Sequence, residues 1–196
     1  MKIIGLTGPM ASGKSRTAAF FRAQGIPVFD ADAEVHKMYG KDGEAVAAIA
    51  AIFPQAVAEG EVRRDLLSPI IVADPAALTS LEAIIHPLLR RREREFLDTE
   101  RRRGSPLVVL DLPLLFEMGR ADHVDVIVAT TAPEAILRQR ALERPGMSED
   151  KYARLLAAQL PTAEKLARAH YVIDTSRGLA YAEGQVAAII AAHGRR

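Results

Sequence analysis

The residues best suited to chemistry form one short segment near the N-terminus, Gly8-Pro9-Met10-Ala11-Ser12-Gly13-Lys14-Ser15. Their spacing matches the phosphate-binding motif GxxxxGK[ST]. Glycines at both ends permit backbone angles that side chains would forbid, so successive N–H groups can converge on phosphate oxygens. Lys14 supplies a positive charge to the outer phosphates, and the Ser15 hydroxyl can coordinate the magnesium ion that bridges them. The segment therefore predicts a loop that binds a nucleoside triphosphate with Mg²⁺.

The sequence around this segment supports the same interpretation. An apolar strand pattern at residues 2–6 precedes the loop, and a helix is expected to begin near Arg16. The positive N-terminal end of that helix would face the bound phosphates. A chance match in a turn is disfavoured because strand, loop and helix occur in the required order. A switch GTPase is also disfavoured, because its guanine-reading motif needs asparagine and this sequence contains none.

Three aspartates follow predicted strands. Asp111 comes directly after the run 107–110, where a carboxylate would lie beside the bound metal, although it could instead cap the next turn. Asp30 and Asp32 follow the run 26–29 and are expected at the same carboxyl edge as the phosphate loop. One of this pair could orient or deprotonate a phosphate acceptor, or could cap the next helix. Spacing alone does not choose between them.

A basic segment lies late in the chain, with seven lysines and arginines between positions 138 and 168. In a phosphotransferase, a mobile segment of this kind neutralises charge on the transferring phosphoryl group and excludes water. Most of these side chains are expected on a solvated helix face, and Arg140 and Arg144 are the two expected to contact phosphate. A lone histidine, His86, is expected to be a structural hydrogen-bonding residue rather than a metal ligand. The cations of this segment include Arg138, Arg140, Arg144, Arg154, Lys165 and Arg168.

Short apolar runs alternate with helical patterns, which predicts an α/β fold with a mostly parallel, about five-stranded sheet covered by helices on both faces. Strands are expected at 2–6, 26–29, 107–110, 124–129 and 171–174. The segment 31–104 is predicted to be helical throughout, with one helix starting at Asp74-Pro75 and another opening at Pro87. It is too long for an ordinary crossover, so we expect an inserted substrate subdomain. Residues 133–169 are expected to form a lid, leaving 1–30, 105–132 and 170–196 as the core of one domain.

The amino-acid composition limits which classes of protein this chain can belong to. The 196 residues carry a net charge of +1 and are 49% hydrophobic, which is typical of a globular protein. Because the sequence contains no cysteine, disulfide bonds and thiolate chemistry are excluded. Neither a membrane-spanning run nor a signal peptide is evident, so a cytosolic location is expected. The small net charge argues against a nucleic-acid partner. We expect small-molecule partners and, for the oligomeric state, a monomer.

With these residues assembled, the whole chain resembles the dephospho-CoA kinases, P-loop enzymes that transfer the ATP γ-phosphate to the ribose 3′-hydroxyl of dephospho-CoA. The resemblance extends from end to end and is far more specific than the P-loop alone. It is carried by Ile4-Gly5-Leu6-Thr7-Gly8, Asp30-Ala31-Asp32, Arg64 before Leu67, Ile85-His86-Pro87, Asp111-Leu112-Pro113-Leu114-Leu115-Phe116-Glu117, Gln159, Lys165 and Tyr171-Val172-Ile173-Asp174.

The resemblance implies a P-loop kinase fold with a helical CoA-side subdomain and a helical lid, and ATP with Mg²⁺. It implies that Asp32 activates the acceptor, and that Arg64, His86 and Leu115 belong to the substrate side. It places Arg140 in the lid as a catalytic residue beside Lys14. For ATP binding it implies Gly8, Ala11, Ser12, Gly13, Lys14, Ser15, Arg16 and Arg144, with Ser15 and, indirectly, Asp111 at the metal.

Several positions depart from the family pattern. Ala11 stands where glycine is usual, and Arg16 replaces a threonine expected near the α-phosphate. Thr175 and Arg177 replace the usual asparagine and glycine near the expected base-binding edge, and His170 replaces a common aspartate. Two alternatives remain open: a nucleoside or nucleoside monophosphate kinase, and a nucleotide-binding sensor that has lost its chemistry. Acceptor-dependent ADP release discriminates among the three.

Overall fold

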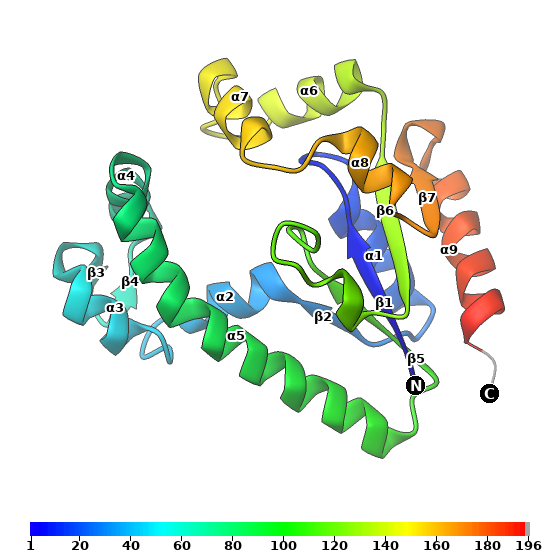
Figure 1. Cartoon of the computed structure of the whole chain (residues 1–196), viewed down its shortest axis with the longest axis horizontal. Helices are drawn as coiled ribbons and strands as arrows, with labels where there is room; N and C mark the ends of the chain where they lie inside the picture. Colours follow the sequence, from blue (N-terminus) through cyan, green and yellow to red (C-terminus); the bar gives the residue numbers. More distant parts are fainter. Residues whose placement is uncertain (195–196) are drawn as a thin grey trace. The chain divides into compact units, whose positions relative to one another are not determined.

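The computed structural model describes residues 1–194 of the chain (Figure 1). They form two compact units, one comprising Met1–Phe29 with the chain from Glu100 onward and the other Asp30–Thr99. Within these described residues, every helix is too short or too polar to cross a membrane.

A five-stranded sheet forms the centre of the first unit, with the strand order β2-β5-β1-β6-β7 (Figure 1). β1 pairs in parallel with β5 on one side and β6 on the other, and β6 pairs in parallel with β7. This arrangement confirms the predicted P-loop fold class and places the end of β1 between the ends of β5 and β6. The strands are β1 (Lys2–Thr7), β2 (Val28–Asp30), β5 (Leu107–Asp111), β6 (Val126–Thr131) and β7 (Tyr171–Asp174).

Alternation along the strands explains how the sheet is covered. Every second residue of three central strands joins one apolar core with helices α1 (Lys14–Ala23) and α9 (Leu179–His193). On β1, Gly5 points to the other face, where an added Cβ would lie 3.1 Å from Val124 and 3.2 Å from Leu115. The core residues are Ile4, Leu6, Ala18, Phe21, Leu107, Val109, Val126, Val128, Ile173, Ala182, Val186 and Ile189.

Three further helices lie between β6 and β7 in the sequence: α6 (Glu134–Leu142), α7 (Glu149–Ala157) and α8 (Thr162–Ala167). The Ser148 side chain caps α7 by accepting a hydrogen bond from the Lys151 N–H. Two short 3₁₀ turns, η2 (Ala121–His123) and η3 (Thr175–Arg177), follow the loop after β5 and the end of β7. Figure 1 shows α6 and α7 side by side above the carboxyl edge of the sheet.

The second unit is largely helical. Its helices are α2 (Ala31–Tyr39), α3 (Val46–Ile52), α4 (Arg64–Ala73) and most of α5 (Pro75–Arg103), with a 3₁₀ turn η1 (Pro54–Ala56). It also contains a two-stranded antiparallel sheet, β3 (Val57–Ala58) with β4 (Glu61–Val62). The prediction that this segment is helical throughout was therefore wrong at residues 57–62.

The hairpin escaped sequence analysis because its strands have only two residues each, too few to show an alternating pattern. Its turn residues Glu59 and Gly60 both have positive φ angles, 53° and 80°. Two consecutive left-handed residues make the tight turn that suits the twist of paired strands. The Gly60 in this turn was the one local signal available.

The prediction that Pro87 separates two helices was also wrong, because Pro87 lies inside α5, a single helix of 29 residues. Proline removes one helical N–H and crowds the preceding turn, a cost of about 3 kcal/mol in a helix interior. Buried Ile85 and Leu89 lie on either side of Pro87, so core packing holds the helix together across the defect. The start of α5 matches the prediction, with Asp74 Oδ1 accepting a hydrogen bond from the Ala76 N–H at 2.8 Å.

Candidate active site

The phosphate loop connects β1 to α1, and its glycines are required by close contacts. A Cβ on Gly8 would lie 2.4 Å from Thr130 Oγ1, which no side chain could tolerate. Gly13 adopts the left-handed conformation at the start of α1, with φ at 85°. A Cβ there would also press against the Thr175 side chain at 3.0 Å. Both glycines therefore let neighbouring segments approach the loop backbone closely.

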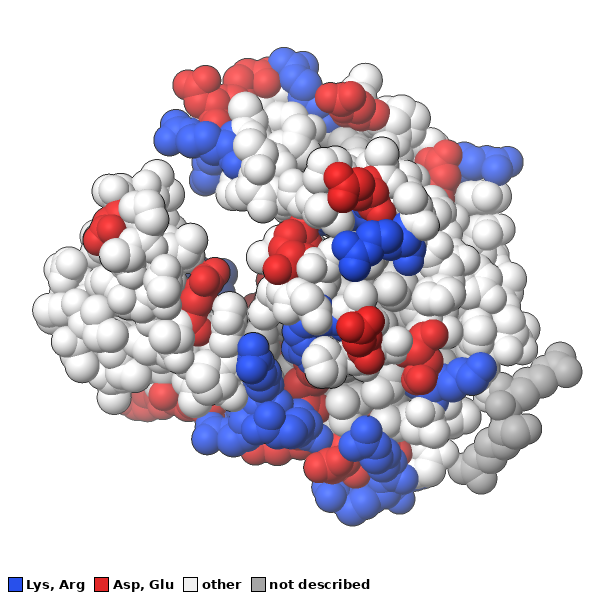
Figure 2. Space-filling view, viewed as in Figure 1, with Lys and Arg blue, Asp and Glu red and all other residues white. Residues whose placement is uncertain are grey.

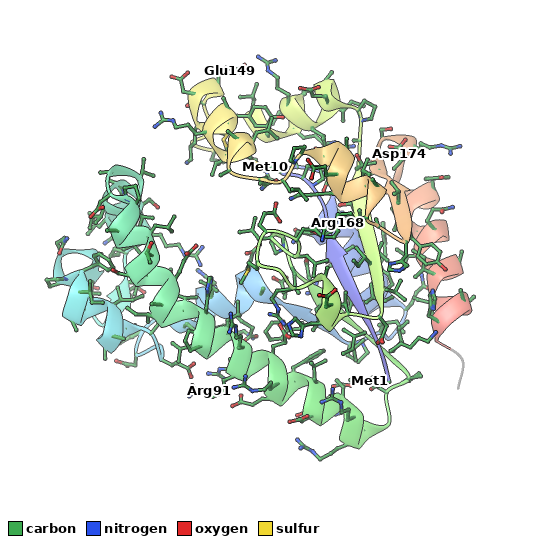
Figure 3. All side chains as sticks on the ribbon, viewed as in Figure 1. Met1, Met10, Arg91, Glu149, Arg168 and Asp174 are labelled. Atoms are coloured by element: carbon green, nitrogen blue, oxygen red, sulfur yellow. The ribbon has the colours of Figure 1, made fainter. Side chains whose placement is uncertain are left out.

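Ala11 holds the conformation that glycine usually provides at this point, with φ at 63°. The left-handed region costs a residue with a Cβ roughly 1 kcal/mol. The Ala11 side chain is buried in a small apolar cluster with Ala141 and Tyr152 from α6 and α7. Met10, labelled in Figure 3, packs against the same cluster. Packing against these two helices thus offsets the strain of having alanine in the loop.

The side chain of Ser12 is used inside the protein. Its Oγ lies 2.6 Å from Thr130 Oγ1, and the Thr130 hydroxyl is also 3.3 Å from the carbonyl of Thr7. The Ser12 N–H donates to the carbonyl of Pro9 at 3.2 Å. Thr130, at the end of β6, therefore supports the loop from behind. Sequence analysis missed this role, although the position at the carboxyl edge of a predicted strand was a usable signal.

Lys14 and Asp111 form an ion pair across the end of the sheet. Lys14 Nζ lies 2.5 Å from Asp111 Oδ1, and their side chains are 14% and 2% exposed. The β1–β5 register, which pairs Leu6 with Asp111, brings the two segments together. The carboxylate predicted from the strand pattern thus lies beside the P-loop lysine.

The first turn of α1 presents two exposed residues, Ser15 and Arg16. A hydroxyl at Ser15 and a buried carboxylate at Asp111 are hard oxygen donors, the type that Mg²⁺ selects. They are few, as expected for a metal that keeps several waters and binds phosphate oxygens. These residues therefore fit a magnesium ion delivered with a nucleotide.

The arginines between β6 and β7 differ sharply in their contacts. Arg140 is half-buried, and its guanidinium donates to Thr175 Oγ1 at 2.9 Å and to the Thr175 carbonyl at 3.2 Å. Arg138 instead pairs with Glu149 on the surface. Arg144 is exposed beyond the end of α6, and its contacts in the described structure are backbone hydrogen bonds to Ala141 and from Met147. Arg140 is thus linked to the phosphate loop through Thr175, whose hydroxyl also contacts the Ser12 carbonyl, whereas the described contacts of Arg144 give it no such link.

A buried ion pair holds the segment after α7. Lys165 is completely buried, and its Nζ lies 2.7 Å from Glu117 Oε1. The same carboxylate oxygen accepts a hydrogen bond from the Leu160 N–H at 2.8 Å. Burial alone would raise the pKa of Glu117, but the contacts with Lys165 and Leu160 outweigh it and the pKa is lowered. Lys165, predicted as part of a solvated basic face, is instead a core cation.

In the second unit, Asp30 and Asp32 have different surroundings. Asp30 ends β2 and caps α2, with its Oδ1 accepting a hydrogen bond from the Ala33 N–H at 3.0 Å. Asp32 lies in the first turn of α2 and is exposed. The capping role that spacing left open therefore belongs to Asp30, and Asp32 is the carboxylate that remains open to solvent.

The second unit also contains a cavity of about 220 Å³ formed where α2, β4 and α4 meet. Arg64 lies over the ring of Tyr39, with its guanidinium carbon 5.2 Å from the ring centre. Burial raises the pKa of Tyr39, and the nearby Arg64 charge opposes part of that effect. His86 is not among the lining residues, which are His36, Tyr39, Gly40, Glu61, Val62, Arg63 and Arg64.

Leu115 belongs to the core of the first unit. Its side chain is 0% exposed and packs toward Gly5, so it can offer a substrate its backbone at most. Over the face seen in Figure 2, acidic and basic side chains are interspersed. Charged groups are thus abundant on this face, and the charged pair at the end of β1, Lys14 with Asp111, is largely shielded from solvent.

A glycine-rich loop between β1 and α1, a lysine–aspartate pair at its base and an arginine docked against it define a P-loop protein of the kinase type. A family model described as dephospho-CoA kinase matches residues 2–180. Two dephospho-CoA kinases from different strains of Rhodopseudomonas palustris are similar, one 46% identical over 98% of this chain and 96% of its own length. The other is 50% identical over 91% of this chain and 89% of its own. The chain therefore belongs to the dephospho-CoA kinase family.

Solved structures agree with this fold. A Thermus thermophilus protein is 34% identical, with a TM-score of 0.84 and 97% of both chains covered. The dephospho-CoA kinase of Campylobacter jejuni is 22% identical, with a TM-score of 0.73 over 99% of this chain and 98% of its own. At that identity the second comparison supports the fold alone.

Proposed function

We propose that this protein transfers the γ-phosphoryl group of ATP to the ribose 3′-hydroxyl of dephospho-CoA, giving CoA and ADP. The observation that carries the proposal is the ion pair between Lys14 and Asp111 at the P-loop, in a chain that belongs to the dephospho-CoA kinase family. A sensor that still bound MgATP would also need these two charges, so it is membership of a kinase family that argues for retained chemistry. The sensor alternative is therefore the weaker one.

On the nucleotide side, the loop from Gly8 to Ser15 binds the phosphates through its backbone and through Lys14. Ser15 and Asp111 would hold the magnesium ion, Asp111 through a water molecule. When bound, the metal neutralises charge on the phosphate oxygens. Arg140 adds a fixed cation beside the loop for the transferring group, and Arg16 and Arg144 extend toward the nucleotide from exposed positions.

On the acceptor side, Asp32 accepts the hydrogen bond of the 3′-hydroxyl. The hydroxyl oxygen attacks the γ-phosphorus, the bond from that phosphorus to the ADP oxygen breaks, and Asp32 takes the proton. Its exposed carboxylate suits this role, whereas the Asp30 carboxylate caps α2. The chain places Asp32 two residues after the end of β2.

The helical second unit binds the rest of dephospho-CoA. Support comes from its cavity, which combines an aromatic ring, a histidine and two arginines, a set suited to a diphosphate with an attached heterocycle. Arg64 is the lining residue that family resemblance also assigns to the substrate. We propose that residues 133–169 serve as a lid over ATP, and that magnesium-bound ATP is the nucleotide used.

ADP release with an acceptor panel tests this function. The protein is incubated with MgATP and, separately, dephospho-CoA, adenosine, AMP, UMP and shikimate. Turnover with dephospho-CoA should exceed that with every other acceptor by on the order of 100-fold, because a site built around its polar groups rejects molecules that lack them. Preferential turnover of a nucleoside or nucleotide would replace the proposal with the alternative kinase, and absence of turnover with every acceptor would favour the sensor.

A further inference from the structure

Thr175 joins three segments that meet at the phosphate loop. It follows Asp174, the last residue of β7, which is labelled in Figure 3. Thr175 Oγ1 lies 2.9 Å from the carbonyl of Ser12 in the loop and 3.1 Å from the carbonyl of Thr131 at the end of β6. The third contact at this oxygen is the Arg140 guanidinium from α6, at 2.9 Å.

A hydroxyl has one hydrogen to donate and two lone pairs that accept. The Thr175 hydroxyl therefore donates to one of the two carbonyls while accepting from Arg140. The carbonyl of the same residue accepts a second hydrogen bond from Arg140 at 3.2 Å. The guanidinium is thus fixed by two oxygens of one residue, and that residue is itself fastened to the loop backbone.

The methyl group of Thr175 makes a separate packing contact. A Cβ on Gly13 would lie 3.0 Å from Thr175 Cγ2, so the methyl group packs against the backbone at the start of α1. Packing and hydrogen bonding therefore come from different atoms of the side chain. Valine keeps the packing and removes the hydroxyl, whereas serine keeps the hydroxyl and removes the methyl group.

Arg140 keeps its charge available in this arrangement. The oxygens that hold it are a hydroxyl and a carbonyl, which are neutral. The nearby carboxylate of Asp174 accepts from the Ser176 hydroxyl at 2.6 Å and from its N–H at 2.9 Å. These bonds, with smaller effects of the Arg177 and Arg140 charges, lower the pKa of Asp174. In the described part of the chain, Arg140 forms no ion pair within 4 Å. Three of its five N–H donors remain for an anionic ligand.

We propose that Thr175 is a positioning residue for phosphoryl transfer: its hydroxyl orients Arg140 toward the outer phosphates of a nucleoside triphosphate bound in the P-loop. The residue acts through Arg140 and makes no bond to the reacting atoms itself. Fixing the guanidinium before the ligand arrives removes the entropy cost of ordering a long side chain at the moment of binding. The predicted effect of Thr175 on turnover rests on the proposed kinase function. Its predicted effect on nucleotide binding does not, because nucleotide binding can be measured without an acceptor.

The test compares Thr175→Val and Thr175→Ser in two assays. The first assay measures two dissociation constants. One is for MgADP, and the other is for the magnesium complex of a non-hydrolysable ATP analogue that has an imido group between the β- and γ-phosphorus. The second assay measures kcat and KM with MgATP and dephospho-CoA. Thr175→Val should lower kcat by roughly ten-fold, because it removes a hydrogen bond to a charged group. For the same reason it should lower the ratio of the MgADP dissociation constant to that of the triphosphate analogue by roughly ten-fold. Thr175→Ser should stay within about three-fold of the parent in both assays.

Arg140→Ala supplies the control for indirect action. If Thr175 acts through Arg140, adding Thr175→Val to Arg140→Ala should lower kcat by less than about a further three-fold, because the effects of coupled residues are not additive. Thermal melting confirms that each variant is folded, and Thr175→Ala serves as a second hydroxyl-free variant if valine does not fold. Equal losses for valine and serine, or the same loss with and without Arg140, would overturn the proposal. If the parent does not phosphorylate dephospho-CoA, the binding assay still decides the role of Thr175.

Discussion

Lys14 Nζ lies 2.5 Å from Asp111 Oδ1, so the P-loop lysine is paired with the carboxylate at the end of β5. Each group has a different partner in a nucleotide complex: the lysine contacts the outer phosphates and the carboxylate lies beside the magnesium ion. The pair thus gives each of two largely shielded charges a partner, and a bound magnesium nucleotide would offer each a different one. One structural contact therefore serves both the stability of the free protein and the organisation of the site.

Substitution of Lys14 separates these two roles. Lys14→Ala should reduce turnover by at least about 100-fold, because it removes a cation that stabilises the transferring phosphoryl group. It should also lower the melting temperature by a few degrees, because Asp111 stays buried without its lysine. In Lys14→Ala/Asp111→Asn the melting temperature should recover and turnover should not. Parent-like turnover of Lys14→Ala at saturating MgATP would remove Lys14 from the site.

The two aspartates after β2 give a matched pair of variants. Asp32→Asn keeps the shape of the side chain and loses its charge, so kcat should fall by on the order of 100-fold with ATP affinity unchanged. Asp30→Asn should be mild, because asparagine caps a helix about as well as aspartate. Steady-state kinetics with both substrates varied provide the measurement. A loss confined to ATP binding in Asp32→Asn would contradict its role toward the acceptor.

The arginines of the second-unit cavity provide a similar comparison. Arg63 is engaged by Asp65 through two hydrogen bonds, at 3.0 Å and 2.8 Å, whereas Arg64 contacts only the ring of Tyr39 among the described side chains. Arg64→Ala should therefore raise KM for dephospho-CoA by roughly ten-fold and leave KM for ATP unchanged. Arg63→Ala should have a smaller effect. An equal rise in both KM values for Arg64→Ala would argue against a role specific to the acceptor.

Sequence alone was sufficient for the parts of this structure that depend on local spacing or on long apolar runs. The P-loop and the five strands of the main sheet are examples, since each has a pattern several residues long. The β3–β4 hairpin and the continuity of α5 through Pro87 were missed because packing between distant residues decides them.

The same distinction explains the site. Asp111 could be foreseen because the end of a predicted parallel strand fixes its position. The role of Thr175 could not be foreseen, and the only signal for Thr130 was its position after a predicted strand. Each residue contacts Ser12 from more than 100 residues away in the sequence, at 2.6 Å for Thr130 and 2.9 Å for Thr175. The choice between Asp30 and Asp32 needed the observed hydrogen bond to Ala33.

The buried pair of Lys165 and Glu117 predicts an asymmetry in stability. Glu117→Gln leaves the fully buried lysine charge without its counter-charge, and should lower the free energy of unfolding by about 3 kcal/mol. Lys165→Met should cost less, because the charge leaves the core and the partly exposed carboxylate still accepts from Leu160. Urea unfolding at neutral pH measures both. A larger loss for Lys165→Met would contradict this account of the pair.

The same pair predicts a pH dependence. The folded pKa of Glu117 lies below its ordinary value of 4.5, so the carboxylate contributes stability that is present above that value. This contribution is lost as the pH falls through the folded pKa. The stability difference between the parent and Glu117→Gln should therefore be constant above about pH 5.5 and shrink below pH 4.5. A difference that grows on acidification would show that the folded pKa is raised.

Transfer of label from [γ-³²P]ATP to dephospho-CoA is the most direct measurement of the central claim. The protein is incubated with labelled MgATP and dephospho-CoA, the product is isolated, and the phosphorylated position is assigned by ³¹P and ¹H NMR. The account predicts one labelled product with a phosphate monoester on the ribose 3′-oxygen, formed together with one ADP per CoA, and none with Lys14→Ala. Label on another oxygen or another acceptor, or ADP released as inorganic phosphate appears without labelled CoA, would contradict it.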